Sequence, residues 1–101
     1  MKALSIRSPW WEKILSGEKT IETRTWQTKY RGDFLICATK PKGMAVGIAE
    51  IVDCRPMSSD DWTKACCPKY DGAFGLHLRN VRPIKNFPVK GKLSFYEVEM
   101  P

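Results

Sequence analysis

A short charged segment beginning at Gly17 combines residue types that bind anions and transfer protons. It reads Gly-Glu-Lys-Thr-Ile-Glu-Thr-Arg and places Lys19, Glu22 and Arg24 within six positions. An arginine fork can donate two parallel hydrogen bonds to a phosphate, and a glutamate can accept from the exocyclic amine of cytosine or guanine. In an enzyme, Glu22 could act as a general base that activates water while Lys19 stabilises an oxyanion. Lys19 and Glu22 are thus candidate catalytic residues, and all three are candidate ligand contacts.

The spacing of these three side chains sets a condition on the backbone. Residues 20–23 are rich in β-branched side chains, which is typical of a strand, and side chains three apart in a strand point to opposite faces. Lys19 can therefore meet Glu22 only from the turn after Gly17, before the strand begins, whereas Glu22 and Arg24 share a face. The alternative interpretation is an ion-pair network that only fixes the strand to its neighbours, because such networks resemble functional sites.

Aromatic residues alternate with basic ones directly after this segment. Trp26 and Tyr30 lie among Arg24, Lys29 and Arg31, so they could form a surface on which an unpaired base stacks. The equally weighted alternative is that Trp26 packs over the mouth of a barrel and Tyr30 fixes the loop.

Four further residues are weaker candidates for ligand contact. Ser5 and Arg7 precede the first expected helix and could contact a phosphate. His77 and Arg79 share the polar side of a later strand. A histidine there could contact a ligand or shuttle a proton, although a lone histidine is more often structural.

Two short helices are expected. Ser8 suits the N-cap of the first and Pro9 its first helical position, Gly17 suits its end, and its apolar stripe comprises Trp10, Trp11, Ile14 and Leu15. Ser58 and Ser59 could cap the second, whose expected inner residues are Trp62, Ala65 and Cys66.

The remaining apolar and alternating segments predict strands. They span residues 2–6, 20–23, 34–38, 45–52, 74–79 and 93–100. Gly47 and Ala49 indicate close packing or a bulge, residues 40–43 suit a turn, and residues 82–88, with two prolines, are expected to be irregular. These elements predict one α+β domain over residues 1–101, with a mostly antiparallel, barrel-like sheet.

The charge balance favours an anionic partner without naming it. The 17 Lys and Arg exceed the 11 Asp and Glu, giving a net charge of +6, and a surplus of this size attracts polyanions. Basic residues concentrate in residues 24–42 and 79–92. A nucleic-acid surface and a solvated basic rim explain this pattern about equally well.

Composition also limits the cofactors and the location. The four cysteines form no Cys-x-x-Cys pair and there is one histidine, so we expect no metal site and no cofactor. No apolar run approaches the ~20 residues of a membrane span, and the amino terminus lacks a signal-peptide core. We expect a cytoplasmic protein without membrane contact, and a monomer or weak dimer.

The combined pattern resembles the ASCH domain family, which has a PUA-like barrel fold. The family motif Gly-x-Lys-x-x-x-x-Arg, with an acid two positions before the Arg, corresponds to Gly17, Lys19, Glu22 and Arg24. Similarity extends to Trp26 and to the segments 5–10, 30–32 and 87–91, and it covers essentially the whole chain. Within the family, the chain is most similar to the ASCH domain at the carboxyl end of the eukaryotic activating signal cointegrator protein.

The resemblance implies a cleft beside the first helix, lined by Lys19, Glu22 and Arg24, and a role in recognising RNA or single-stranded nucleic acid. One branch of the family hydrolyses N4-acetylcytidine with a Lys-x-x-Thr motif, in which Thr is the proposed nucleophile. This chain has Glu22 at the Thr position, with Thr20 and Thr23 beside it. We therefore favour nucleic-acid binding. The alternatives are a hydrolase on modified nucleosides and a domain that recognises a nucleotide-like small ligand or a protein.

Overall fold

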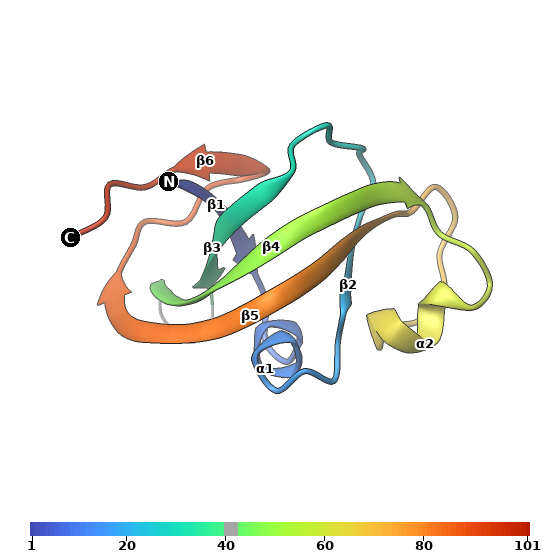
Figure 1. Cartoon of the computed structure of the whole chain (residues 1–101), viewed down its shortest axis with the longest axis horizontal. Coiled ribbons are helices and arrows are strands. Elements are labelled where there is room, and N and C mark those ends of the chain that lie inside the picture. Colours follow the sequence, from blue (N-terminus) through green and yellow to red (C-terminus); the bar gives the residue numbers. More distant parts are fainter. Residues whose placement is uncertain (40–42) are drawn as a thin grey trace.

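The computed structural model describes residues 1–39 and 43–101, so the predicted turn at 40–43 lies largely outside the described residues. The chain forms six strands and two short helices (Figure 1). In chain order they are β1 (Lys2–Ile6), α1 (Trp10–Leu15), β2 (Ile21–Arg24), β3 (Gly32–Ala38), β4 (Met44–Pro56), α2 (Asp61–Ala65), β5 (Phe74–Pro88) and β6 (Phe95–Glu97).

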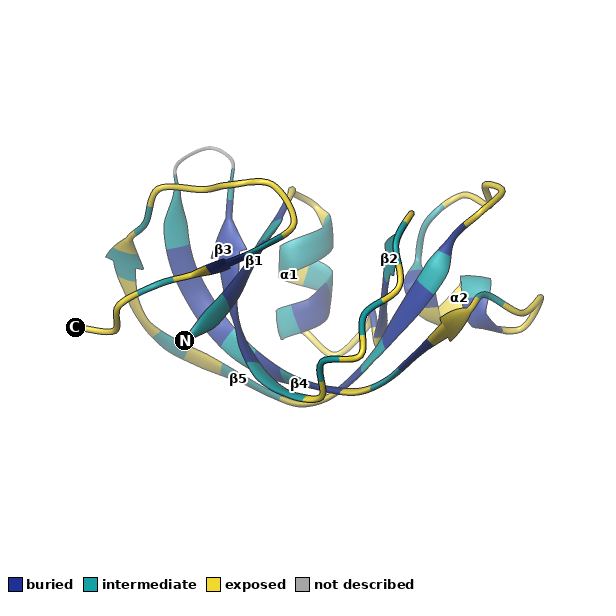
Figure 2. Ribbon diagram, turned by 90° about the horizontal axis from the view of Figure 1, so that it is seen from above, coloured by how far each residue is buried: buried dark blue, intermediate teal, exposed yellow. Residues whose placement is uncertain are grey.

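All six strands join one sheet in the order β2-β5-β4-β3-β1-β6. The pairing of β1 with β3 is parallel and every other pairing is antiparallel. The two longest strands, β4 and β5, pair with three shifts of register, and such irregularities bend a sheet. Seen from above, the sheet forms a curved trough with α1 between its two sides (Figure 2). The predicted α+β, mostly antiparallel and barrel-like architecture is confirmed.

The core occupies both faces of β3. Phe34 and Ile36 belong to the main apolar cluster on the side of α1, whereas Leu35 and Cys37 belong to a second cluster with Tyr96 of β6. This follows from the alternation of side chains along a strand. Because both of its faces are covered, β3 is buried from residue 34 to residue 38.

Gly47 of β4 is where α1 approaches the sheet. A Cβ atom at this position would lie 2.6 Å from Cδ2 of Leu15 and 2.9 Å from the carbonyl oxygen of Arg82. The register between β4 and β5 also shifts between Ala45 and Gly47. The predicted close packing and the predicted bulge therefore occur together.

The predicted N-cap of α1 is wrong, whereas the predicted end of this helix at Gly17 is confirmed. Pro9 occupies the N-cap of α1 without a side-chain cap, because the Ser8 hydroxyl instead donates to the Glu12 carboxylate at 2.7 Å. Gly17 follows the C-cap Ser16 with a left-handed φ of 85°, so it ends the helix one residue beyond the cap.

The start of α2 also differs from its expected capping. Asp60 is the N-cap in place of the expected Ser58 or Ser59, and its side chain accepts no capping hydrogen bond. The carboxylate of Asp61 accepts from the backbone N–H of Ser58 at 3.0 Å. The cap interaction therefore runs from the first helical turn back to the serine backbone.

Residues 82–88 are strand, and the expectation that they are irregular is wrong. The pairing of β5 with β2 ends at His77, so beyond this point β4 is its sheet neighbour among the described strands. An edge strand tolerates proline because its outward N–H groups need no sheet partner. Pro83 and Pro88 are therefore compatible with a strand.

Three other expectations need correction. The last strand is shorter than residues 93–100, because Ser94 has a φ of 58° and Leu93 is 95% exposed. Trp62 is half-buried against Tyr70, with ring centroids 5.5 Å apart, and is not part of the main core. Cys66 is the left-handed C-cap of α2 and not an inner helix residue. Neither described helix is long and apolar enough to cross a membrane.

Candidate ligand-binding cleft

Lys19, Glu22 and Arg24 meet as the sequence predicts. Lys19 lies in the turn between α1 and β2, and its Nζ is 3.4 Å from Oε1 of Glu22. Nη2 of Arg24 is 2.9 Å from the other carboxylate oxygen of Glu22. Lys19 and Glu22 are 2% and 6% exposed, so one buried carboxylate joins two cations.

The ammonium of Lys19 is held from three sides. Besides Glu22, it donates to the carbonyl oxygen of Ala65 in the last turn of α2, where helix carbonyls lack partners within the helix. It also lies 5.3 Å from the ring centroid of Trp10, a cation–π distance. The backbone N–H of Lys19 donates to the carbonyl of Lys13 at 2.9 Å, which fixes the turn.

Arg24 spans the open side of the trough. Its Nη2 donates to the carbonyl oxygen of Ser5 in β1 at 3.0 Å, and β1 is not a neighbour of β2 in the sheet. Its Nε is buried and has no hydrogen-bond partner among the described residues. Buried donors are normally paired, so this N–H is an unsatisfied donor on a residue that lines a cavity.

A cavity of about 160 Å³ lies at this junction. This is roughly ten times the ~15 Å³ that one water molecule needs. We call it the cleft; its lining comprises Ser5, Arg7, Trp10, Lys19, Glu22, Thr23, Arg24 and Cys67.

Comparison with known proteins identifies the family of this chain. The family model for the ASCH domain matches residues 4–87. The chain belongs to the ASCH family. No curated protein matches the sequence.

Solved structures show that this ASCH domain shares its fold with distant proteins. The crystal structure of ASCH from Zymomonas mobilis superposes with a TM-score of 0.81 at 18% identity, covering 97% of this chain and 87% of that one. A Tyr-to-Phe variant of the protein from the same organism gives a TM-score of 0.72 at 17% identity, covering 97% and 89%. A Ser-to-Ala variant from that organism gives a TM-score of 0.72 at 16% identity, covering 97% of this chain and 87% of that one. These likenesses show the predicted PUA-like fold.

Three residues that line the cleft, Trp10, Thr23 and Cys67, were not predicted as ligand contacts. Thr23 and Cys67 line the cleft, and the Thr23 hydroxyl lies 3.7 Å from the Cys67 sulfur. Thr23 could have been considered because it lies between Glu22 and Arg24. Cys67 enters because the left-handed Cys66 turns the chain at the end of α2, a turn without a sequence signal.

Trp26 and Tyr30 lie outside the residues that line the cleft. Both pack on Phe95 of β6, with ring centroids 5.4 and 5.9 Å away. The Tyr30 hydroxyl donates to the carbonyl oxygen of Asp33 at 2.6 Å. These contacts correspond to the packing alternative for the two aromatic residues.

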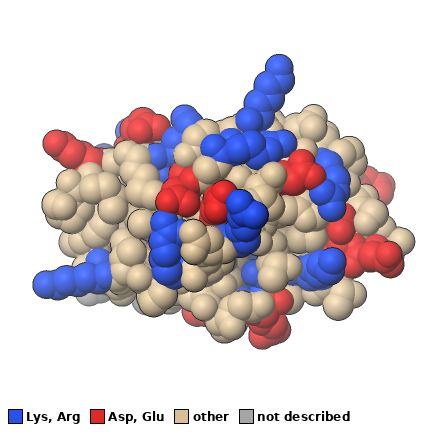
Figure 3. Space-filling view, in the orientation of Figure 1, with Lys and Arg blue, Asp and Glu red and all other residues tan. Residues whose placement is uncertain are grey.

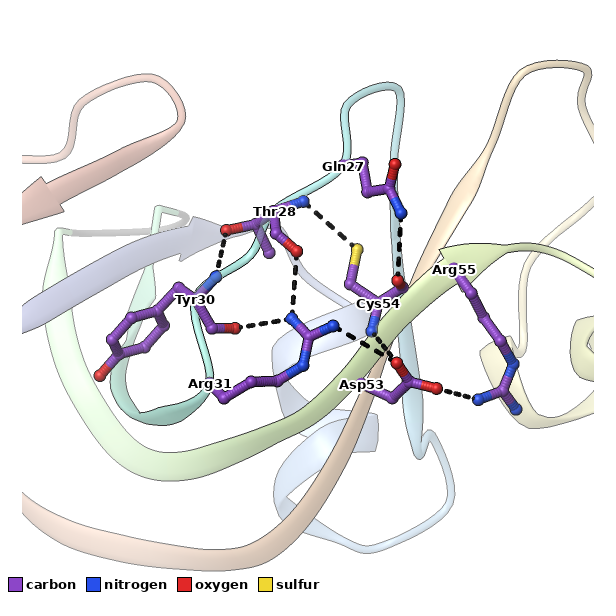
Figure 4. Close-up of polar contacts among 7 residues, drawn as sticks. All are labelled: Gln27, Thr28, Tyr30, Arg31, Asp53, Cys54 and Arg55. Atoms are coloured by element: carbon purple, nitrogen blue, oxygen red, sulfur yellow. Dashed lines mark hydrogen bonds and ion pairs between the residues drawn. The ribbon is translucent and has the colours of Figure 1, made fainter.

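Arg31 also points elsewhere, toward β4 (Figure 4). Its guanidinium donates to the carbonyls of Thr28 and Tyr30 at 3.0 Å each and lies 3.4 Å from the carboxylate of Asp53. A hydrogen bond from Arg55 is the main cause that lowers the pKa of Asp53. Arg31 thus ties the loop after β2 to β4.

His77 and Arg79 do not face the cleft. Glu22 pairs across from Leu76, so the cleft lies on the Leu76 side of β5 and His77 on the other. Burial lowers the pKa of His77, and its Nε2 is buried without a described partner. Arg79 contacts both carboxylate oxygens of Glu50, at 3.1 and 3.2 Å. Acidic groups lie beside basic ones on the face of β4 and β5 (Figure 3).

Within the described residues, no cluster of three or more His, Cys, Asp or Glu side chains could hold a metal ion. The cleft instead offers one carboxylate acceptor and cationic donors. This combination can bind a polar group that carries both a donor and an acceptor.

Proposed function

We propose that this ASCH domain binds RNA or another single-stranded nucleic acid through the cleft. The main support comes from the Arg24 guanidinium. Its Nη2 forms an ion pair with Glu22 and donates to the Ser5 carbonyl oxygen, whereas its buried Nε has no described partner. An unsatisfied buried donor costs about 1–3 kcal/mol. A phosphate or base oxygen at Nε would recover this cost.

The other cleft groups suit a nucleotide. Each oxygen of Glu22 contacts one cation, and a carboxylate has about four acceptor sites in all, so Glu22 can also accept from a base amine. Arg7 is exposed and forms no ion pair with any described residue. The family relationship adds support, because the PUA-like ASCH family is often linked to RNA binding.

The contacts of Lys19 favour binding over hydrolysis. Its ammonium is directed at Glu22 and the Ala65 carbonyl, and it donates to no hydroxyl among the described residues. Thr20 is exposed, and the hydroxyl of Thr23 is 3.7 Å from Cys67. No threonine is therefore bonded to Lys19 as a nucleophile would be to its activating base.

The test is titration of a fluorescent single-stranded RNA at several salt concentrations. We expect affinity that falls linearly with the logarithm of salt concentration. Arg24→Gln should weaken binding about tenfold, or ~1.4 kcal/mol. The matched control is Arg79→Gln, which removes a cation paired with Glu50 outside the cleft lining and should change affinity by less than about twofold.

Equal affinities for Arg24→Gln and wild type would contradict the proposal. Incubation with N4-acetylcytidine tests the hydrolase alternative, and turnover that Glu22→Gln abolishes would favour it. Affinity that does not grow with oligonucleotide length would instead favour a small nucleotide-like ligand.

A further inference from the structure

A second groove adjoins the cleft on the side of the carboxyl-terminal segment. It has a volume of about 490 Å³ and shares Ser5, Arg7 and Arg24 with the cleft. Its other wall consists of Thr39, which follows β3, and residues 91–94, which connect β5 to β6. The two spaces therefore adjoin at Ser5, Arg7 and Arg24.

Two buried polar atoms on residues of this groove have no hydrogen-bond partner among the described residues. One is Nε of Arg24, and the other is Oγ1 of Thr39. A hydroxyl and a guanidinium N–H are both donors. Buried polar groups in native proteins are nearly always paired, and two of the four unpaired buried side-chain atoms among the described residues belong to residues of this groove.

The charges of the groove have one sign. Its lining includes the cations Arg7, Arg24 and Lys92 and contains no acidic residue. Arg7 and Lys92 form no ion pair within the described part of the chain. The contrast is with the face of β4 and β5, where basic side chains such as Arg79 and Arg82 lie against carboxylates.

Gly91 lets the backbone form a close wall. A Cβ atom there would lie 3.1 Å from the Ser5 hydroxyl oxygen and 3.7 Å from the Thr39 methyl carbon. The Ser5 hydroxyl is itself bonded to the Tyr96 hydroxyl at 2.8 Å. The segment at Gly91 therefore approaches Ser5 and Thr39 without a side chain between them, and the Thr39 hydroxyl has no described hydrogen-bond partner.

We propose that this groove binds the phosphate of a nucleotide whose base lies in the cleft. The proposal rests on the proposed function and adds a separate position for the phosphate. The Thr39 hydroxyl and the Arg24 Nε–H donate to phosphate oxygens, while Arg7 and Lys92 neutralise the charge. Charge-assisted hydrogen bonds of this kind are the strong ones. Glu22, whose charge would repel a phosphate, lines the cleft and not the groove.

Calorimetry with small probes tests the inference. The probes are cytidine, cytidine 5′-monophosphate, cytidine 3′-monophosphate and inorganic phosphate. We expect at least one monophosphate to bind about tenfold more tightly than the nucleoside. Thr39→Val and Lys92→Gln should each reduce this advantage severalfold and leave the affinity for cytidine unchanged.

Matched variants separate these effects from general ones. Thr39→Ser keeps the hydroxyl and should retain the phosphate advantage. Lys85→Gln removes an exposed cation of β5 that does not line the groove and should leave the advantage intact. Thermal unfolding checks that each variant is folded.

The two proposals fail in different ways. Equal affinities for cytidine and both monophosphates, with RNA binding retained and sensitive to Arg24→Gln, would overturn the phosphate groove alone. Binding of inorganic phosphate that Thr39→Val weakens, without any binding of cytidine or RNA, would support the groove and contradict the proposed function. Loss of the phosphate advantage in Lys85→Gln as large as in Lys92→Gln would overturn the groove.

Discussion

Arg24 donates to the backbone carbonyl of Ser5 at 3.0 Å, joining strands that three others separate in the sheet order β2-β5-β4-β3-β1. The same guanidinium nitrogen lies 2.9 Å from Glu22. The curled sheet brings β2 and β1 together without backbone pairing, so side chains bridge them. The cleft lies at this bridge because the sheet leaves that side open.

Replacing Lys19 should destabilise the fold. In Lys19→Met, Glu22 loses one of its two cations and the Ala65 carbonyl loses its donor, both in buried surroundings. Removing one partner of a buried pair costs about 3–5 kcal/mol; since Arg24 remains on Glu22, we expect about 3 kcal/mol in the free energy of unfolding by urea.

The double variant Lys19→Met/Glu22→Gln should recover part of that loss, because no carboxylate is then left short of a cation. A loss of less than about 1 kcal/mol in Lys19→Met alone would show that the contacts of Lys19 do not stabilise the fold.

Substitution of Gly47 should weaken the contact of α1 with the sheet. In Gly47→Ala, the new methyl would overlap Leu15 and a backbone oxygen of Arg82, and overpacking costs about 1–3 kcal/mol. Denaturant unfolding should show a loss in the free energy of unfolding of about 3 kcal/mol. Gly72→Ala is the control, because a methyl there meets nothing within 4 Å and only its φ of 78° opposes it, which costs about 1 kcal/mol. Equal losses at the two glycines would contradict the packing argument.

His77 should make stability depend on pH. Burial is the main cause that lowers the pKa of His77, Arg55 lowers it further, and Asp61 and Asp53 act in the opposite direction. The unfolded chain therefore binds this proton more readily than the folded one. The contribution to stability is complete above the unfolded pKa of about 6.5 and is lost as pH falls toward the lower folded pKa.

The measurement is the melting temperature of wild type and His77→Gln between about pH 7.5 and 5.5. The melting temperature of wild type should decrease more than that of the variant as the pH falls. The imidazole resonances can be assigned directly, since this is the only histidine in the chain. A folded pKa above 6.5 would overturn the prediction.

Tyr96 should be the last tyrosine to ionise. Burial is the main cause that raises its pKa to about 12, while its hydroxyl shares a hydrogen bond with Ser5. Its neutral form is favoured in the folded state, so this contribution is present below the unfolded pKa of about 10 and is lost as pH rises through about 12. Ultraviolet titration should show one lagging tyrosine that disappears in Tyr96→Phe. A lagging signal that survives the substitution would assign it elsewhere.

Local rules predicted the parts of this protein that depend on neighbours in sequence. The alternation of β2 placed Glu22 and Arg24 on one face, and the helix end at Gly17 placed Lys19 in the turn, as the structure has them. The family motif gave the fold. Several residues near the start of α2 could cap it, and sequence preferences chose the wrong one, because Asp61 bonds to the backbone of Ser58. The capping free energies of such candidates differ by less than ~1 kcal/mol.

Tertiary structure decided which distant residues join these parts. Residues 82–88 continue β5 because they pair with β4, and the other edge of this segment is unpaired among the described strands, so its prolines are tolerated. No local sequence pattern predicts this pairing. The curl of the sheet brings Ser5, Thr39 and Cys67, from three separate segments, toward Arg24. The same curl brings Trp26 against Phe95 of β6 and not into the cleft. The sequence alone determined the charged triad, whose members are close along the chain. The cleft and groove around it depend on how strands far apart in sequence approach across the open side of the sheet.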